Sequence, residues 1–382
     1  MVQWSGRRAA ILTSVRLSQS GTGKEVFVTV TPRSARPAGQ QAETLFGGVA
    51  EVLRREGARP IQERVFGTEE AVRIAADART VAYGDLDDGV PPALLRVPEG
   101  VQGPLGAIQV HAVQSQEPPA VLTENDGSCG RLLNTGSIGY VALSGLMAPE
   151  AGTNADQAGA VFEKAANLLR RIGGSMASVA RTWLYLDDIL SWYDALNAVR
   201  NRFFLNTGLI DPDAGKQRLP ASTGIGVAPA GDAACALDLV AMVGPKASIA
   251  HYCAAGMQEC AYEYGSAFSR VATAGTPGGT TVYVSGTAAI DEAGHTQYLG
   301  DAAGQIEMTL ENVQAALRDH DCTDADVVYA IAYSKTPEVQ ARFDREYAPR
   351  LGWPCISVLG DVCRDELLFE LEATACVGAR SA

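Results

Sequence analysis

The sequence contains few histidines, no closely spaced cysteine pair and no long apolar run. It has 4 histidines and 8 cysteines, and none of the cysteines forms a C-x-x-C motif. Because no histidine lies at ligand spacing from a cysteine pair either, the pattern excludes the common structural zinc sites. We therefore expect no metal, and free, mostly buried thiols in a reducing cytoplasm.

Signals for a membrane or a cofactor are also lacking. No apolar stretch approaches the ~18 residues needed to cross a bilayer. The first residues, MVQWSGRRAAILTSVRL, lack the apolar centre of a signal peptide. The glycine-rich run TPGGTT at 276–281 precedes neither a lysine nor a helix, so it predicts a hairpin turn and no phosphate loop. We expect a cytoplasmic protein with no cofactor and no membrane partner.

Basic residues are scarce relative to acidic ones. The 382 residues include 31 Lys and Arg against 44 Asp and Glu, which gives a formal net charge of −13. This balance argues against a nucleic-acid partner, because a phosphate backbone requires a basic face. A small anionic substrate would require a local group of arginines that acts against the overall field. We expect a small-molecule substrate.

One pattern of elements occurs three times along the chain. In each copy, apolar residues at helical spacing predict an amphipathic helix, and a strand-like run follows it. A second helix comes next, and an apolar strand closes the copy. The first helices are predicted at 40–57, 155–173 and 303–320, and the closing strands at 106–113, 236–244 and 368–378.

The repeats indicate three related α+β modules of about 125 residues each. We expect their boundaries at 1–125, 126–247 and 248–382, with a degenerate first module. When the closing strands are aligned, Gln109, Asp238 and Glu370 occupy equivalent positions.

Longer motifs resemble known proteins. The repeated unit is similar to the Rid family of reactive imine deaminases, which has the YjgF-like fold, is trimeric and places its sites between subunits. RTWLYLDDILSWYDALNAVRNRFF at 181–204, LPASTGIG at 219–226, EYGSAFSR at 263–270 and DVCRDELLFELEATA at 361–375 resemble the chorismatases, which act on chorismate and release pyruvate. The resemblance implies three fused Rid-like (chorismate-mutase-like) modules that form a pseudo-trimer within one chain. Because such a chain completes its own sites, we expect a monomer or a simple homodimer.

Glu370 matches the catalytic acid of the chorismatases and the Rid glutamate. Cleavage of an enolpyruvyl ether begins with protonation of its terminal carbon, which requires a carboxylic acid that stays protonated near neutral pH. The apolar strand around Glu370 favours this state, because burial disfavours the charged carboxylate. Strand alternation places Glu372 on the same face. For both carboxylates the alternative is a pair with an arginine at a module interface. Gln109 and Asp238 predict that the other two clefts have lost the reaction.

Arginines are expected to bind the two carboxylates of chorismate, because the guanidinium group pairs with carboxylates in a bidentate geometry. Arg270, at the end of EYGSAFSR, is the first candidate, and Arg181 is the second. Arg200 is interpreted as a solvated charge on a helix. Arg364 is expected to pair with the adjacent Asp365.

Hydroxyl groups are the remaining candidates for substrate contacts. Tyr264 and Tyr185 could each donate a hydrogen bond to a ring hydroxyl or a carboxylate, with packing in the core as the alternative. Ser222 and Thr223 lie in the loop that faces the cleft in Rid proteins, which makes them weaker candidates.

Cys363 and Val271 are the residues from which the reaction product and the substrate are inferred. Cys363, seven residues before Glu370, resembles the chorismatases that form 3-hydroxybenzoate, whereas others form a dihydroxycyclohexadiene carboxylate. Val271 stands where the family usually has Gly or Ala. Together with Cys260 it motivates an alternative: a cyclase or aromatising enzyme of the same fold that acts on another alkaloid-type or polyketide-type intermediate.

A Rid-like imine hydrolase is a further alternative. That activity uses an arginine in a closing loop, and the corresponding loops here, LPASTG and WPCISV, contain none. The leading hypothesis is a metal-free chorismatase-like enzyme that supplies an aromatic acid to secondary metabolism.

Overall fold

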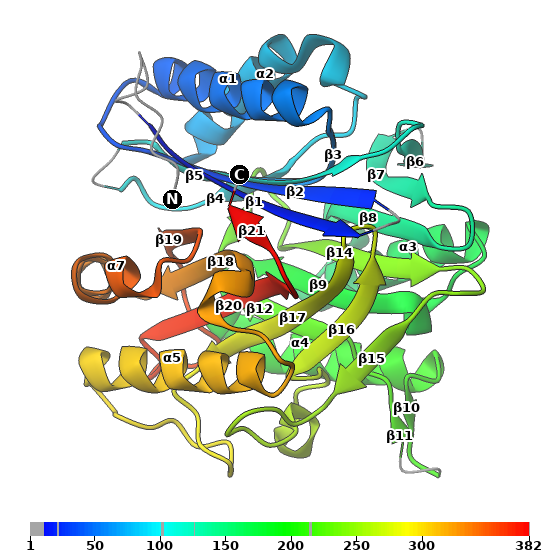
Figure 1. Ribbon diagram of the computed structural model, residues 1–382. Helices are drawn as coiled ribbons and strands as arrows, with labels where there is room; N and C mark the ends of the chain where they lie inside the picture. Colours follow the sequence, from blue (N-terminus) through cyan, green and yellow to red (C-terminus); the bar gives the residue numbers. More distant parts are fainter. Residues whose placement is uncertain (1–10, 21–22, 101–102, 126, 214–215, 382) are drawn as a thin grey trace.

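The computed structural model describes residues 11–20, 23–100, 103–125, 127–213 and 216–381. Residues 1–10, which form most of the stretch tested for a signal peptide, lie outside this part. Three large sheets form the body of the protein, and helices cover their outer faces (Figure 1). Each sheet is built mainly from one module, and the modules are numbered 1 to 3 along the chain.

Among the described residues, module 1 contains five strands and two α-helices. They are β1 (Ile11–Ser20), β2 (Gly23–Pro32), α1 (Ala38–Glu56), β3 (Arg59–Gly67), α2 (Glu69–Tyr83), β4 (Ala93–Arg96) and β5 (Leu105–Gln114). Helix α1 is terminated by Gly57, whose φ of 59° lies in the left-handed region that glycine tolerates. Thr68 caps α2 by accepting a hydrogen bond from the backbone N–H of Ala71.

Module 2 repeats this plan and adds short strands. Its main elements are β6 (Ala120–Glu124), β7 (Gly127–Asn134), β8 (Gly139–Leu146), α3 (Asn154–Arg171), β9 (Val179–Leu186), α4 (Ile189–Asn206), β12 (Ala221–Ile225) and β14 (Cys235–Val243). Strands β10 (Ile210–Asp211) and β11 (Lys216–Gln217) form a small hairpin, and β13 (Ala228–Pro229) pairs with β4 of module 1.

Module 3 follows the same plan. Its elements are β15 (Ile249–Tyr252), β16 (Val271–Thr276), β17 (Gly279–Ala288), α5 (Ala302–Arg318), β18 (Val327–Ser334), α6 (Pro337–Arg342), α7 (Ala348–Leu351), β19 (Cys355–Leu359) and β20 (Phe369–Cys376). The predicted second helix is interrupted by a π-helical stretch, Phe343–Tyr347. The run 276–281 forms the turn between β16 and β17, as predicted. Strand β21 (Arg380–Ser381) pairs with β1 and returns the chain to module 1.

The strand order confirms the prediction of three related modules. It is β4–β3–β5–β2–β1 in module 1, β12–β9–β14–β8–β7 in module 2 and β19–β18–β20–β17–β16 in module 3. In each of these orders the first pair is parallel and the remaining pairs are antiparallel. Module 1 has the complete set of elements, although its sequence matches the others least.

The three sheets share one central core. Each module has its own apolar cluster between the sheet and its helices. A further cluster joins the inner faces of all three sheets and includes Phe66, Trp183 and Tyr333. Each sheet is therefore buried on both faces, and any charged residue on an inner face must find a partner there.

The described residues were searched for metal sites and for membrane-spanning helices. No group of three or more His, Cys, Asp and Glu side chains there could hold a metal ion. No helix in the same residues is long and apolar enough to cross a membrane.

Candidate functional site

A pocket lies between modules 2 and 3, and the space in it that no atom occupies, together with the open solvent at its mouth, amounts to about 540 Å³. Helix α4 and strand β12 of module 2 form one wall. Strands β17 and β20 of module 3, with the segments that precede β16 and β20, form the other. Five of the predicted site residues line this one pocket: Glu370, Arg270, Tyr264, Ser222 and Cys363.

Glu370 lies near the start of β20 and is 5% exposed. Its carboxyl group forms no hydrogen bond or ion pair with another described residue. Burial raises the pKa of Glu370 to about 8, because the charged form is poorly solvated. The nearby charge of Glu372 also raises this pKa, whereas Arg181 and Arg270 lower it. A carboxyl group with this pKa is mostly protonated at neutral pH.

The Glu370 carboxyl group lies directly over the backbone of Gly286 in β17. A β-carbon at position 286 would overlap Oε1 of Glu370, far inside the contact distance of non-bonded atoms. The N–H of Gly286 donates a hydrogen bond to Oγ1 of Thr223 at 3.0 Å, which fixes β17 against β12. Only glycine at position 286 is therefore compatible with this position of the acid.

The register of the sheets corrects the predicted equivalence of the closing strands. In each module one polar residue pairs with the residue three before the end of the neighbouring strand: Gln109 with Arg64, Asp238 with Trp183 and Glu372 with Ile331. Glu372, not Glu370, is thus the equivalent of Gln109 and Asp238. Glu370 instead corresponds to Ala107 and Ala236. The sequence alignment of the closing strands was therefore displaced by two residues. Because side chains alternate between the two faces of a strand, a displacement of two keeps the same face and the same hydropathy pattern, so the sequence alone does not reveal it.

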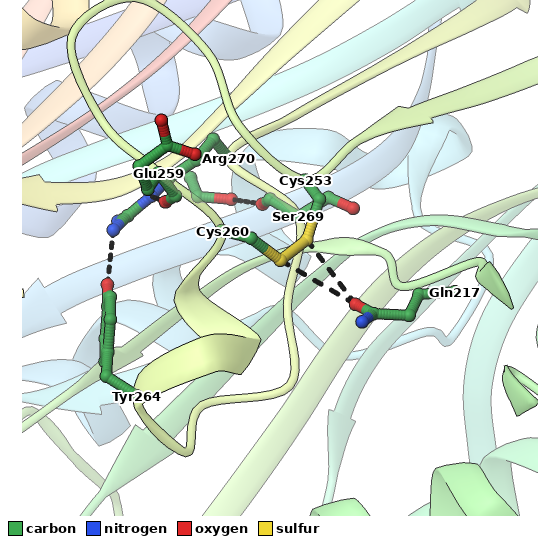
Figure 2. Close-up of a disulfide and its surroundings, with 8 residues drawn as sticks. Gln217, Cys253, Glu259, Cys260, Tyr264, Ser269 and Arg270 are labelled. Carbon is green, nitrogen blue, oxygen red and sulfur yellow. Dashed lines mark hydrogen bonds between the residues drawn. A yellow bond between two sulfur atoms is a disulfide. The ribbon is translucent and has the colours of Figure 1, made fainter. Parts of the chain in front are cut away.

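Arg270 is held by the loop that precedes β16. Its Nε donates a hydrogen bond to the backbone carbonyl of Glu259 at 3.0 Å, and its Nη2 donates one to the hydroxyl of Tyr264. The backbone N–H of Arg270 donates to the carbonyl of Cys253 at 3.3 Å. Tyr264, in the same loop, lies below the guanidinium group (Figure 2). Both predicted contact residues are therefore positioned by one loop.

Two further arginines line the pocket, and the sequence interpretation of both was wrong. Arg200 is 2% exposed and not solvated, and its Nε has no hydrogen-bond partner among the described residues. It lies seven residues after Tyr193, so both point from one face of α4 into the pocket, a spacing visible in the sequence. Arg364 donates a hydrogen bond to the carbonyl of Gly294 at 2.7 Å and is not paired with Asp365.

Three predicted contact residues lie outside the pocket lining. Arg181 forms a buried ion pair with Glu372, with Nη2 2.9 Å from Oε2. Tyr185, on the same strand β9, is fully buried in the central core. Val271 belongs to the apolar cluster between the module 3 sheet and α5. The strand pattern cannot distinguish a side chain that faces the pocket from one that faces the adjoining core, since both positions are buried.

Cys253 and Cys260 form a disulfide, so the prediction of free thiols was wrong for this pair. The loop brings their Cα atoms to 4.7 Å, within the range that a disulfide spans. The other six cysteines are free, as predicted. The disulfide lies beside Gln217 of the β10–β11 hairpin and closes the loop that holds Arg270 (Figure 2). A separation of seven residues is not a recognisable motif, which is why the sequence did not indicate the bond.

Comparison with solved structures gives a match over most of the chain. A crystal structure of a chorismatase superposes with a TM-score of 0.60 and 22% identity, covering 83% of this chain and 93% of that chain. The chain has the chorismatase fold. The pocket described above therefore lies within a chorismatase fold.

Smaller structures match single stretches of the chain. A YjgF-family protein from Mycobacterium tuberculosis has 23% identity and covers 34% of this chain and 98% of its own, with a TM-score of 0.26. A Rid-family protein from Yersinia pestis has 20% identity and covers 28% of this chain and 86% of its own, with a TM-score of 0.25. No family model and no curated protein sequence matches the chain.

Substitution of Gly286 by alanine tests the packing of the acid in this chorismatase fold. The added methyl group displaces the Glu370 carboxyl group, and we expect a loss of about 1–3 kcal/mol in the free energy of unfolding. Chemical denaturation measures this loss. Gly47→Ala is the control, because nothing lies within 4 Å of a β-carbon at that helical position. An unchanged stability of Gly286→Ala together with an unmoved Glu370 in its crystal structure would contradict the geometry.

Reduction of the disulfide tests its structural contribution. Closing so short a loop lowers the entropy of the unfolded chain, so we expect reduction to cost about 2–3 kcal/mol of stability. Urea unfolding with and without dithiothreitol measures the difference. The variant Cys253→Ser with Cys260→Ser should have the stability of the reduced protein and should not respond to dithiothreitol. A dithiothreitol response that persists in this variant would show that the effect has another origin.

Proposed function

We propose that the protein is a chorismatase-like enzyme that protonates and cleaves the enolpyruvyl ether of chorismate and releases pyruvate. The observation that carries the proposal is Glu370, a buried carboxyl group with a pKa of about 8 in a pocket of a chorismatase fold. A general acid of this kind accelerates a reaction by about 10²–10⁴-fold.

The chemistry requires one proton at one carbon atom. Glu370 transfers its proton to the terminal methylene carbon of the enolpyruvyl group, and the carbon beside the ether oxygen becomes an oxocarbenium ion. Water or a hydroxyl group of the substrate adds to this ion.

With water, the hemiketal collapses by breaking the bond between its carbon and the ether oxygen, so pyruvate leaves and the ring keeps that oxygen as a hydroxyl group of the dihydroxycyclohexadiene carboxylate. With the neighbouring ring hydroxyl, a cyclic ketal forms instead. It collapses as the ring carbon that bears the ether oxygen loses its proton: pyruvate leaves with the oxygen of the hydroxyl, the ether oxygen stays on the ring and takes up a proton, and the ring becomes the aromatic hydroxybenzoate. The protein supplies the proton and excludes bulk water, because Glu370 is 5% exposed.

Chorismate carries two carboxylates, and the pocket supplies cationic groups for them. Arg200, Arg270 and Arg364 all line it. The unpartnered Nε of Arg200 is a donor directed at no protein acceptor among the described residues, which suits a ligand carboxylate. This local group answers the objection that an overall charge of −13 disfavours an anionic substrate.

Cys363 supports a hydroxybenzoate product, with 3-hydroxybenzoate favoured over a dihydroxycyclohexadiene carboxylate. It lines the pocket with Glu370, and burial raises the pKa of its thiol to about 12. The thiol is therefore neutral and presents a compact side chain to the ring. Such a product would serve as an aromatic building block in secondary metabolism.

The alternative of another biosynthetic substrate has no support in the pocket. Val271 and Cys260, the two residues that motivated it, lie in an apolar core and in the disulfide, respectively. The pocket arginines instead favour a substrate with more than one carboxylate.

Incubation with chorismate, with pyruvate detected by a coupled assay, tests the proposal. We expect pyruvate release by the wild type and a loss of at least about 100-fold in Glu370→Gln, because an amide cannot supply the proton. Glu338→Gln, an exposed change in the same module, should retain activity. An absence of pyruvate at high enzyme concentration would refute the proposal.

The pH dependence of kcat/KM gives a second test. Because the acid must be protonated, activity should be constant below its pKa of about 8 and fall about tenfold per pH unit above it. The decline thus occurs as pH rises. A profile that decreases with a midpoint near 4 to 5, the ordinary range of a carboxyl group, would show that the pKa of Glu370 is not raised in the free enzyme.

A further inference from the structure

Glu372, the second buried carboxylate of β20, takes no part in the proton transfer described above. It nevertheless lies two residues from the acid and is fixed by several contacts. We propose that Glu372 is a positioning residue for Glu370: its buried carboxylate, fixed on the same face of β20, opposes ionisation of the acid by charge repulsion. This inference rests on the function proposed above, in which Glu370 is the proton donor.

Glu372 is anchored by three groups of module 2. Its Oε2 forms the ion pair with Arg181 at 2.9 Å, and its Oε1 accepts a hydrogen bond from Nε1 of Trp183 at 2.8 Å. The hydroxyl of Thr223 also donates to Oε2. At 2% exposure the carboxylate has no solvent to screen its charge. Glu372 is therefore a fixed negative charge at the boundary between modules 2 and 3.

The anchor and the acid are linked through adjoining strands. Residues 370 and 372 lie on one face of β20, and strand geometry puts their Cα atoms about 7 Å apart. Thr223, which holds Glu372, also accepts the hydrogen bond from the N–H of Gly286. The Glu370 carboxyl group packs on that same glycine. One hydroxyl group thus fixes both the negative charge and the surface on which the acid rests.

The two arginines near Glu370 do not form ion pairs with it, so they do not cancel the repulsion from Glu372. Arg181 forms its ion pair with Glu372, and Arg270 donates to Tyr264 and to a backbone carbonyl. Glu372 accordingly raises the pKa of Glu370 by more than either arginine lowers it. The titratable and charged groups around the acid are Glu372, Arg181, Arg270, Tyr193, Cys363, Tyr333, Tyr264, Arg200 and Arg364.

Module 2 has a buried, ion-paired carboxylate at the position of Glu372 but no carboxyl group at the position of Glu370. Asp238 occupies the register position of Glu372 and forms a buried ion pair with Arg64, with Nε 3.1 Å from Oδ2. Two residues earlier the strand carries Ala236, where module 3 carries Glu370. The anchored carboxylate thus occurs in two modules, and only in module 3 does it stand next to a second carboxyl group.

The experiment is a direct titration of Glu370 in the full-length protein. Glutamate labelled with carbon-13 at the side-chain carboxyl is incorporated, and the resonance of Glu370 is assigned as the one missing from Glu370→Gln. Two unit charges separated by about the Cα spacing of these residues, at an effective dielectric constant of ~20, shift each other's titration by about one to two pH units. We expect the midpoint of Glu370 to fall by this amount in Glu372→Gln and to stay unchanged in Glu338→Gln, a change of the same type at an exposed position of module 3. A midpoint in Glu372→Gln at or above that of the wild type would overturn the proposal.

A second variant guards against misfolding of Glu372→Gln, which leaves Arg181 buried and unpaired. Replacement of both Arg181 and Glu372 by methionine removes the ion pair as a unit, a change that folded proteins often tolerate. Its midpoint should lie below that of the wild type and above that of Glu372→Gln, because the loss of Arg181 acts in the opposite direction. A midpoint at or above the wild type here would also contradict the proposal.

The titration separates this inference from the proposed function. If chorismate yields no pyruvate at any pH while the midpoints follow the expected order, the function is wrong and the electrostatic role of Glu372 stands. If pyruvate is released and the midpoint does not respond to Glu372→Gln, the function stands and the positioning role is wrong.

Discussion

The structure depends on one electrostatic constraint, the pairing of every charge buried where the three sheets meet. The inner faces of the sheets form a shared core, so water cannot solvate a carboxylate there. Asp238 and Glu372 meet this constraint through ion pairs with Arg64 and Arg181. Glu370 is the exception, because it forms no ion pair and its pKa rises to about 8. The same burial that stabilises the core thus creates a protonated carboxylic acid at the edge of a pocket.

The arrangement of the modules explains why this acid faces a pocket. Helix α4 of module 2 brings Tyr193 and Arg200 towards module 3, and the disulfide-closed loop of module 3 brings Arg270 to the same space. Gly286 leaves room for the acid between them. Because the chain fuses the three modules, each contributes different side chains. The closing strand that lines the pocket carries Glu370 where the closing strands of the other two modules carry Ala107 and Ala236.

Much of the fold was predictable from sequence, and the site was predictable in part. The amphipathic helices and apolar strands recur with regular spacing, and Glu370 and Arg270 lie in long motifs. The alignment of Glu370 with Asp238 failed, because a slip of two residues preserves the strand pattern. Arg200 was misread, because a helix pattern does not reveal a second module packed on its polar face. The disulfide depends on a loop conformation that no local pattern encodes.

The central claim is that the Glu370 side chain meets the enolpyruvyl group of a dicarboxylate held between modules 2 and 3. A crystal structure of Glu370→Gln soaked with chorismate tests it most directly, since this variant should bind the substrate without consuming it. We expect the terminal methylene carbon to lie within about 3.5 Å of the side-chain amide introduced at position 370, and Arg200, Arg270 or Arg364 to contact each carboxylate. Chorismate bound with its methylene directed away from position 370, or bound outside this pocket, would contradict the account.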